Sequence, residues 1–172
     1  MNFSIRPTMR RLLSPRHELS CSSTLWRRLL RRLRERGGGR RESGAFLLGS
    51  VADDGRRHIA DFILYDDLDP HALDTGIVHL DGRYFGALWD ICRARKLAVV
   101  ADVHTHPAGS WQSDSDRAHP IISRAGHIAL IVPNFAATPV RRRDVGVYRY
   151  LGGHQWHTIP ARERNDFFHV GI

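Results

Sequence analysis

The chain has 172 residues, a formal net charge of +8 and an apolar fraction of 42%, as expected of one globular domain. No window approaches the roughly 20 apolar residues of a membrane-spanning helix, which excludes a membrane protein. The charge would suit nucleic acid or an acidic protein surface, but 25 of the 26 basic residues are arginine, which biased codon usage explains equally well. Nucleic acid is therefore not favoured as a partner.

The two ends of the chain are expected to lie outside this domain. Residues 1–22 are rich in arginine and lack an apolar secretory core, so they are predicted to form a flexible segment with a faint likeness to a transit peptide. Residues 161–172 are predicted to be a C-terminal tail, which leaves one domain at 23–160. Cys21 and Cys92 form no CxxC pair or disulfide framework, which indicates a reducing cytoplasm.

The first predicted element is an amphipathic helix that begins near Thr24. Ser23 or Thr24 is expected to cap it, and the glycines at 37–39 are expected to end it. Its apolar positions share one face of a helical wheel, with arginines largely opposite. They are Leu25, Trp26, Leu29, Leu30 and Leu33. Packing against a core is favoured over contact with an anionic surface.

A β-hairpin and a second helix follow. Residues 44–51 and 58–65 are predicted strands joined by a turn at 53–55, and residues 66–81 show no clear periodicity. A helix is predicted from about Gly82 to Lys96, because five apolar residues fall on one face. They are Tyr84, Phe85, Leu88, Trp89 and Cys92.

The remaining pattern completes an α/β chain. The apolar, β-branched run 97–103 predicts a buried strand. A short helix at 116–124 and strands at 127–132, 145–150 and 155–159 are predicted after it. This order indicates an α/β sandwich, a mixed central sheet flanked by helices.

Three side chains near the end of the buried strand are candidate metal ligands. His104 and His106 are two residues apart, so both project from the same face of an extended chain. Asp116 is predicted to begin the following helix, and the intervening loop could return its carboxylate to the same place. Two imidazoles and one carboxylate suit zinc with a fourth position open for water, as in catalytic sites. Asp114 is a minor rival as ligand.

These residues are part of a larger pattern. His104, His106 and Pro107 form H-x-H-P, Ser113 and Asp116 form S-x-x-D, and Glu42 lies upstream in ESGAFLLG. The combination resembles the JAMM metalloproteases, also called the MPN-plus or JAB family, over roughly residues 41–150. The spacer between Pro107 and Ser113 has five residues, whereas many members have six.

The resemblance implies a role for each matching residue. His104, His106 and Asp116 would bind Zn²⁺, Glu42 would be the general acid/base and Ser113 would stabilise the oxyanion. It also implies the JAB/MPN-type, cytidine-deaminase-like sandwich, with the metallopeptidase domain at 23–160. Zinc lowers the pKa of bound water to about 7, and a neighbouring carboxylate can accept the proton. A salt bridge to Arg40 or Arg41 is the alternative role for Glu42.

The family also implies a substrate class. The compact bacterial type would hydrolyse the bond after the C-terminal glycine of a ubiquitin-like protein, in deconjugation or precursor processing. The expected partners are that protein, its conjugates and the E1-like and E2-like enzymes of the same operon, including antiphage operons. Such a tail binds in extended form along a sheet edge, which residues 66–79 are expected to shape.

Other functions remain as alternatives. A DNA-associated, RadC-like protein shares a similar H-x-H-P motif, and a non-catalytic MPN scaffold shares the fold. Scaffolds usually lose the ligands that this chain retains, and the upstream glutamate pattern favours a peptidase. Zinc deaminases need a P-C-x-x-C pair, which is missing here. Trp111 is predicted to line the substrate groove or, equally, to pack the loop.

Overall fold

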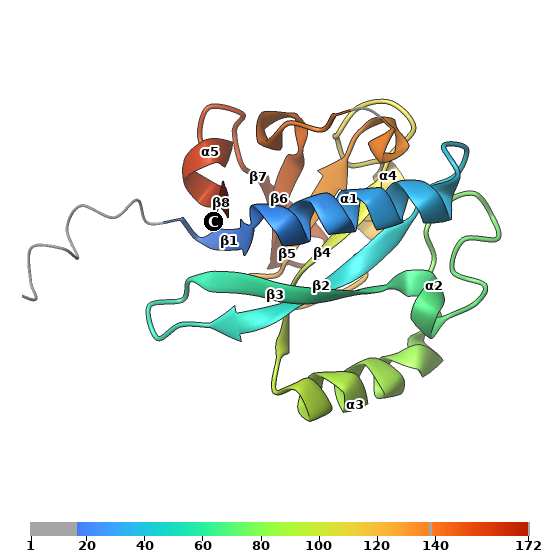
Figure 1. Cartoon of the computed structure of the whole chain (residues 1–172), viewed down its shortest axis with the longest axis horizontal. Coiled ribbons are helices and arrows are strands. Elements are labelled where there is room, and N and C mark those ends of the chain that lie inside the picture. The colour runs from blue at the N-terminus through green and yellow to red at the C-terminus, as the bar shows by residue number, and fades with distance from the viewer. Residues whose placement is uncertain (1–16, 138, 172) are drawn as a thin grey trace, which may run out of the picture.

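The computed structural model describes residues 17–137 and 139–171 and consists of one mixed β-sheet with helices on both faces (Figure 1). The α-helices are α1 (Ser23–Gly37), α2 (Tyr65–Leu68), α3 (Phe85–Arg95), α4 (Asp114–Ala118) and α5 (Arg164–Phe167). The strands are β1 (Leu19–Ser22), β2 (Gly44–Val51), β3 (Arg57–Leu64), β4 (Ala98–Thr105), β5 (Ile128–Val132), β6 (Gly146–Gly152), β7 (Gln155–Thr158) and β8 (Phe168–Gly171). Three 3-10 turns are η1 (Gly82–Tyr84), η2 (Asn134–Ala136) and η3 (Arg142–Asp144).

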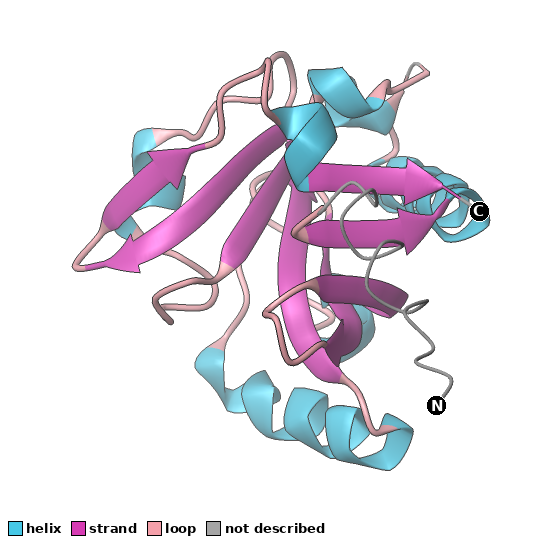
Figure 2. Cartoon of the chain, turned by 90° about the vertical axis from the view of Figure 1, so that its left-hand side faces the viewer, coloured by secondary structure: helices cyan, strands magenta, loops and turns pink. Residues whose placement is uncertain are grey.

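The sheet has eight strands in the order β7-β6-β5-β4-β2-β3-β1-β8, and Figure 2 shows its pronounced twist. The pairs β4–β5, β3–β1 and β1–β8 are parallel, and the remaining neighbours are antiparallel. The predicted mixed sheet flanked by helices is therefore confirmed. The hairpin predicted at 44–65 is formed by β2 and β3, and β4 occupies the centre of the sheet.

The two largest apolar clusters of the described residues lie on opposite faces of this sheet. Side chains alternate along a strand, so Leu47 of β2 packs in the same core as Leu29 of α1, and Phe46 packs with Leu88 of α3 on the other face. All four side chains are fully buried. Helices α1 and α3 therefore hold β2 and its neighbour β4 between them.

Helix α1 forms where the sequence predicts it, with one difference at its start. The cap is Ser22, whose hydroxyl accepts the N–H of Leu25 at 3.2 Å, and not Ser23 or Thr24. A cap residue has extended backbone, and Ser22, at the end of β1, has φ −71° and ψ 148°. Gly38 ends the helix in the left-handed conformation. No helix among the described residues is long and apolar enough to cross a membrane.

The structure places parts of both expected terminal segments in the sheet. Leu19–Ser22 form β1 between β3 and β8, so the segment expected to be flexible up to residue 22 is ordered at its end. The expected tail at 161–172 contributes α5 and β8, with Phe168 fully buried. Burial of this apolar side chain and pairing with β1 hold the segment in place. The rest of the predicted flexible segment, residues 1–16, lies outside the described residues.

The helix predicted at 116–124 is shorter and begins earlier, at Asp114–Ala118. Pro120 explains its end, because the residue before a proline avoids the helical conformation. His119 accordingly leaves the helix with φ −126° and ψ 66°. The chain then continues without regular structure to β5.

Candidate metal centre

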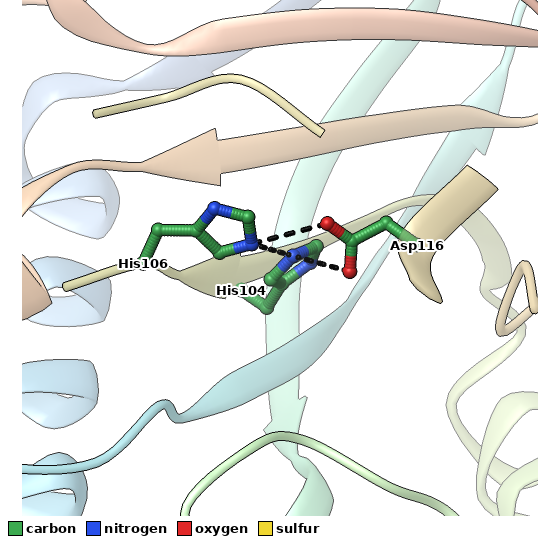
Figure 3. Close-up of side chains that lie close together, drawn as sticks. All are labelled: His104, His106 and Asp116. Atoms are coloured by element: carbon green, nitrogen blue, oxygen red, sulfur yellow. Dashed lines mark hydrogen bonds and ion pairs between the residues drawn. The ribbon is translucent and has the colours of Figure 1, made fainter. Parts of the chain in front are cut away.

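Strand β4 carries the chain from one end of the sheet to the two histidines. His104 is the penultimate residue of β4, and His106 follows the end of the strand. Both histidines are buried, with 8% and 6% of their surface exposed. The backbone of His106 is fixed by its N–H, which donates to the Val132 carbonyl at 2.9 Å. The two Nε2 atoms face each other at 3.0 Å (Figure 3). Both rings therefore direct the same nitrogen to one point.

Asp116 reaches this point from α4, as Figure 3 shows. Its Oδ1 lies 3.4 Å from Nε2 of His104, and its Oδ2 lies 3.1 Å from Nε2 of His106. The carboxylate is oriented by a capping box, in which Oδ2 accepts the Ser113 N–H at 2.7 Å. The start of α4 thus holds the third candidate ligand in place.

The donor set and its spacing fit a tetrahedral divalent metal. One atom from each of the three residues lies within 4.8 Å of the others, and no second group of this kind occurs among the described residues. Zinc bonds of about 2.0–2.2 Å imply ligand atoms about 3.3 Å apart, with a fourth position left for water. The two Nε2 atoms are 3.0 Å apart, and each lies 3.4 or 3.1 Å from a different oxygen of Asp116, which is close to that value. The rival Asp114 is 97% exposed and pairs with Arg117.

The charges of the cluster are strongly coupled. Burial acts to lower the pKa of His104, but Asp116, with smaller contributions from Asp102 and Glu42, raises it above its usual value. Burial acts to raise the pKa of Asp116, but hydrogen bonds to His104 and His106 hold it well below its usual range. The carboxylate is therefore ionised, and the imidazoles face a negative charge that would equally attract a metal cation.

Glu42 lies beside the cluster and is held by backbone groups. Its Oε1 lies 3.8 Å from Nε2 of His106, and its Oε2 accepts the Val78 N–H at 3.3 Å. The Glu42 N–H donates to the Gly76 carbonyl at 2.9 Å. Within the described residues it forms no ion pair with Arg40 or Arg41, the alternative that the sequence left open. The Glu42 carboxylate therefore lies beside His106 and is held there by the Val78 N–H.

Ser113 has a structural role that sequence reasoning did not assign. It is the N-cap of α4, and its hydroxyl accepts the Asp116 N–H at 3.1 Å. The hydroxyl proton remains available to another acceptor. Its function as an oxyanion donor stays a prediction, but its place next to Asp116 is compatible with it.

A groove of about 430 Å³ opens beside the cluster. It is lined by His104 and Asp116, by the segment 77–80, and by His119 and Ile121. Trp111 does not line this groove. It is 66% exposed, and its ring lies over Gly109, where an added Cβ would come within 1.6 Å of it. Trp111 therefore covers its own loop.

One buried polar network near the site was missed by the sequence analysis. Asp102, two residues before His104 on the same side of β4, binds Nε2 of His127 at 2.6 Å and accepts the Tyr65 hydroxyl at 3.1 Å. All three side chains are buried. A charged residue inside the apolar run 97–103 was the available signal, because a buried carboxylate needs partners.

Comparisons with known proteins add a relative and a fold. No protein-family model matches the chain. A probable metalloprotease of Sinorhizobium fredii is 33% identical over 67 residues, which are 39% of this chain and 41% of that protein. The chain thus matches about two fifths of that relative's length. The solution structure of a protein from Desulfitobacterium hafniense has a TM-score of 0.63 at 14% identity, over 90% of this chain and 94% of that one. This second likeness concerns the fold alone.

Proposed function

We propose that the chain is a zinc-dependent peptidase of the JAMM (MPN-plus) type. The observation that carries this proposal is the convergence of His104, His106 and Asp116 on one point, with the Glu42 carboxylate 3.8 Å from the nearest ligand nitrogen. The likeness to a probable metalloprotease supports a metal-dependent protease. The mixed sheet flanked by helices is the architecture expected of a JAB/MPN domain.

Each residue around the cluster would have its own role in hydrolysis. A zinc ion held by His104, His106 and Asp116 would supply a Lewis acid for a water molecule and for the scissile carbonyl. Glu42 would accept the proton of the attacking water and donate it to the departing amine. The Ser113 hydroxyl would donate a hydrogen bond to the oxyanion. Its hydrogen bond with Asp116 already fixes its position.

The groove supports a substrate with a thin, extended end. The segment 77–80 that lines it has no regular secondary structure, and the Val78 N–H donates a hydrogen bond to the Glu42 carboxylate. A peptide beside this segment would bring its carbonyl close to both the base and the metal ligands. The proposed substrate is therefore the C-terminal glycine tail of a ubiquitin-like protein, whose small residues permit close approach. The partners would be that protein, its conjugates and the E1-like and E2-like enzymes of its operon.

The test uses fusions of a ubiquitin-like protein from the proposed operon. The zinc-loaded protein should release whatever follows the terminal glycine, and Glu42→Gln should serve as the inactive blank. Replacement of the substrate's penultimate glycine by phenylalanine should abolish cleavage, since a large side chain would meet the groove wall. Changes on the leaving side should matter less.

The matched control is Glu35→Gln, which alters an exposed glutamate paired with Arg32 on α1. It should cleave at the wild-type rate. If the zinc-loaded protein cuts neither fusion nor lysine conjugate while it binds DNA tightly at physiological salt, the DNA-associated alternative replaces the peptidase.

A further inference from the structure

A second cavity lies at the other end of β4. It has a volume of about 700 Å³ and is lined by the start of β4, the end of α3, the tip of the β2–β3 hairpin and residues 122–127. In Figure 1 the tip of the β2–β3 hairpin lies at the left and α3 at the bottom, both away from α4. Ala98 and His104 are six residues apart on β4, which corresponds to about 20 Å of strand. We name this cavity the basic cleft.

The charged side chains that line the basic cleft are all cationic. Four cationic side chains line it, and no described lining residue is acidic. They are Arg57, Arg93, Lys96 and Arg124. Arg93 pairs with Asp90, but the other three form no ion pair with any residue in the described ranges. Cations gathered in a concave site favour an anion.

Arg57 provides the least solvated of these charges. Its guanidinium donates to the Val100 carbonyl at 3.2 Å and to the Gly126 carbonyl at 2.7 Å. Burial lowers its pKa, the charge of Glu18 opposes this, and Arg149 and Arg124 lower it further. A guanidinium has five N–H donors, so further donors remain for a ligand. A bound anion would compensate the half-buried charge.

Lys96 lines the basic cleft and has an uncommon backbone conformation. It ends α3 with φ 54° and ψ 39°, the left-handed region that glycine usually occupies at this position. It is also the one lysine of the chain. A strained conformation is a recognised mark of a functional position. In this conformation Lys96 lines the basic cleft.

The cleft also offers flat apolar surface. Trp89 is 41% exposed although its ring stacks on Phe85, with centroids 5.8 Å apart. Leu97 and Ile122 add aliphatic contacts. An apolar wall with a few converging polar groups, in a volume of about 300–1,000 Å³, is typical of small-molecule sites.

We propose that the basic cleft binds a small organic anion that carries a flat apolar ring. The ring would lie against Trp89, and the anionic group would contact Arg57, Lys96 and Arg124. A carboxylate or a phosphate ester would satisfy the same donors. The site is separate from the metal centre and does not depend on the proposed peptidase function.

The test is a fluorescence titration of the full chain with anilinonaphthalene sulfonate, a flat aromatic anion, and with its neutral analogue phenylnaphthylamine. The anion should bind at least tenfold more tightly than the neutral compound. The double variant Lys96→Gln/Arg124→Gln should weaken anion binding at least tenfold, and Trp89→Ala should weaken both probes. Arg31→Gln, an exposed arginine of α1, is the control and should bind as wild type.

Competition identifies the anionic group. Displacement by naphthoate supports a carboxylate ligand, and displacement by adenosine monophosphate supports a phosphate ester. Displacement by hexaglutamate alone would overturn the proposal in favour of an acidic peptide. Equal binding of the neutral analogue, or wild-type binding by the double variant, would also overturn it.

A second variant separates binding from folding. Lys96→Gly relieves the left-handed backbone and removes the ammonium, so the fold should be more stable while anion binding is weaker. Unchanged anion binding in this more stable variant would contradict a role for Lys96. Binding by Glu42→Gln should equal that of wild type, which keeps this result independent of the peptidase assay.

Discussion

The charged side chains at the two ends of β4 differ in whether they have partners of opposite charge. At its C-terminal end, His104 and His106 are buried, and the half-buried carboxylate of Asp116 faces them at 3.4 and 3.1 Å. At its N-terminal end, three of the four cations of the basic cleft have no acidic partner among the described residues. The first arrangement fixes side chains around a point that a cation would fill. The second leaves charge available to a ligand.

The largest expected effect is at the metal end. His104→Ala or Asp116→Ala removes one of three ligands, so purified protein should lose its metal and all turnover. Trp89→Ala, in the basic cleft, is the matched change and should keep both. Metal analysis of the three variants checks this, and full metal occupancy in His104→Ala and Asp116→Ala would refute the ligand assignment.

Metal affinity should depend on pH, because a protonated imidazole cannot bind a metal. Asp116 raises the pKa of His104 above its ordinary value of 6.5, although burial opposes this. Affinity should therefore be highest at alkaline pH and should fall as the pH decreases through this raised pKa. Chelator competition at pH 8, 7 and 6 measures the trend. Constant affinity across that range would show that His104 does not bind the metal.

Ser113→Ala should lower turnover by about 100- to 1,000-fold, as expected for a lost oxyanion donor. It also removes the cap of α4, which costs about 1 kcal/mol. Ser123→Ala, in the loop after α4, controls for loss of a hydroxyl and should leave both quantities unchanged. Retained metal with reduced turnover would separate the oxyanion role from a displaced Asp116, whereas wild-type turnover would leave Ser113 as a cap alone.

The smallest effect is expected at the other end of β4. Lys96→Gly should raise the free energy of unfolding by about 1 kcal/mol, since the left-handed conformation is costly for a residue with a Cβ. Turnover should stay within twofold of wild type. Urea unfolding measures this free energy. A lower value in Lys96→Gly than in wild type would contradict the left-handed conformation of Lys96.

Elements with long periodic patterns could be predicted from the sequence. The apolar face of α1, the hairpin at 44–65 and the strand that leads to His104 all form where the pattern indicates. The four-residue strands β1 and β8 could not be predicted, because their pairing depends on each other and on β3.

The candidate site likewise has residues that a local pattern predicts and residues whose place depends on distant segments. The H-x-H spacing places both histidines on one face of a strand, and the structure brings Asp116 and Glu42 to them. The cap formed by Ser113 and the partners of Asp102 depend on where loops and neighbouring strands return. The basic cleft was also missed, because its cations come from separate elements. Such contacts leave no pattern within a single segment.

The most direct test of the central claim measures metal content and turnover on the same sample of Glu42→Gln. The amide preserves the shape of the side chain but cannot accept a proton from water. The variant should retain one metal ion per chain and lose turnover by about 100- to 10,000-fold. Turnover close to that of wild type, with the metal still bound, would contradict the assignment of Glu42 as the general base and with it the proposed mechanism.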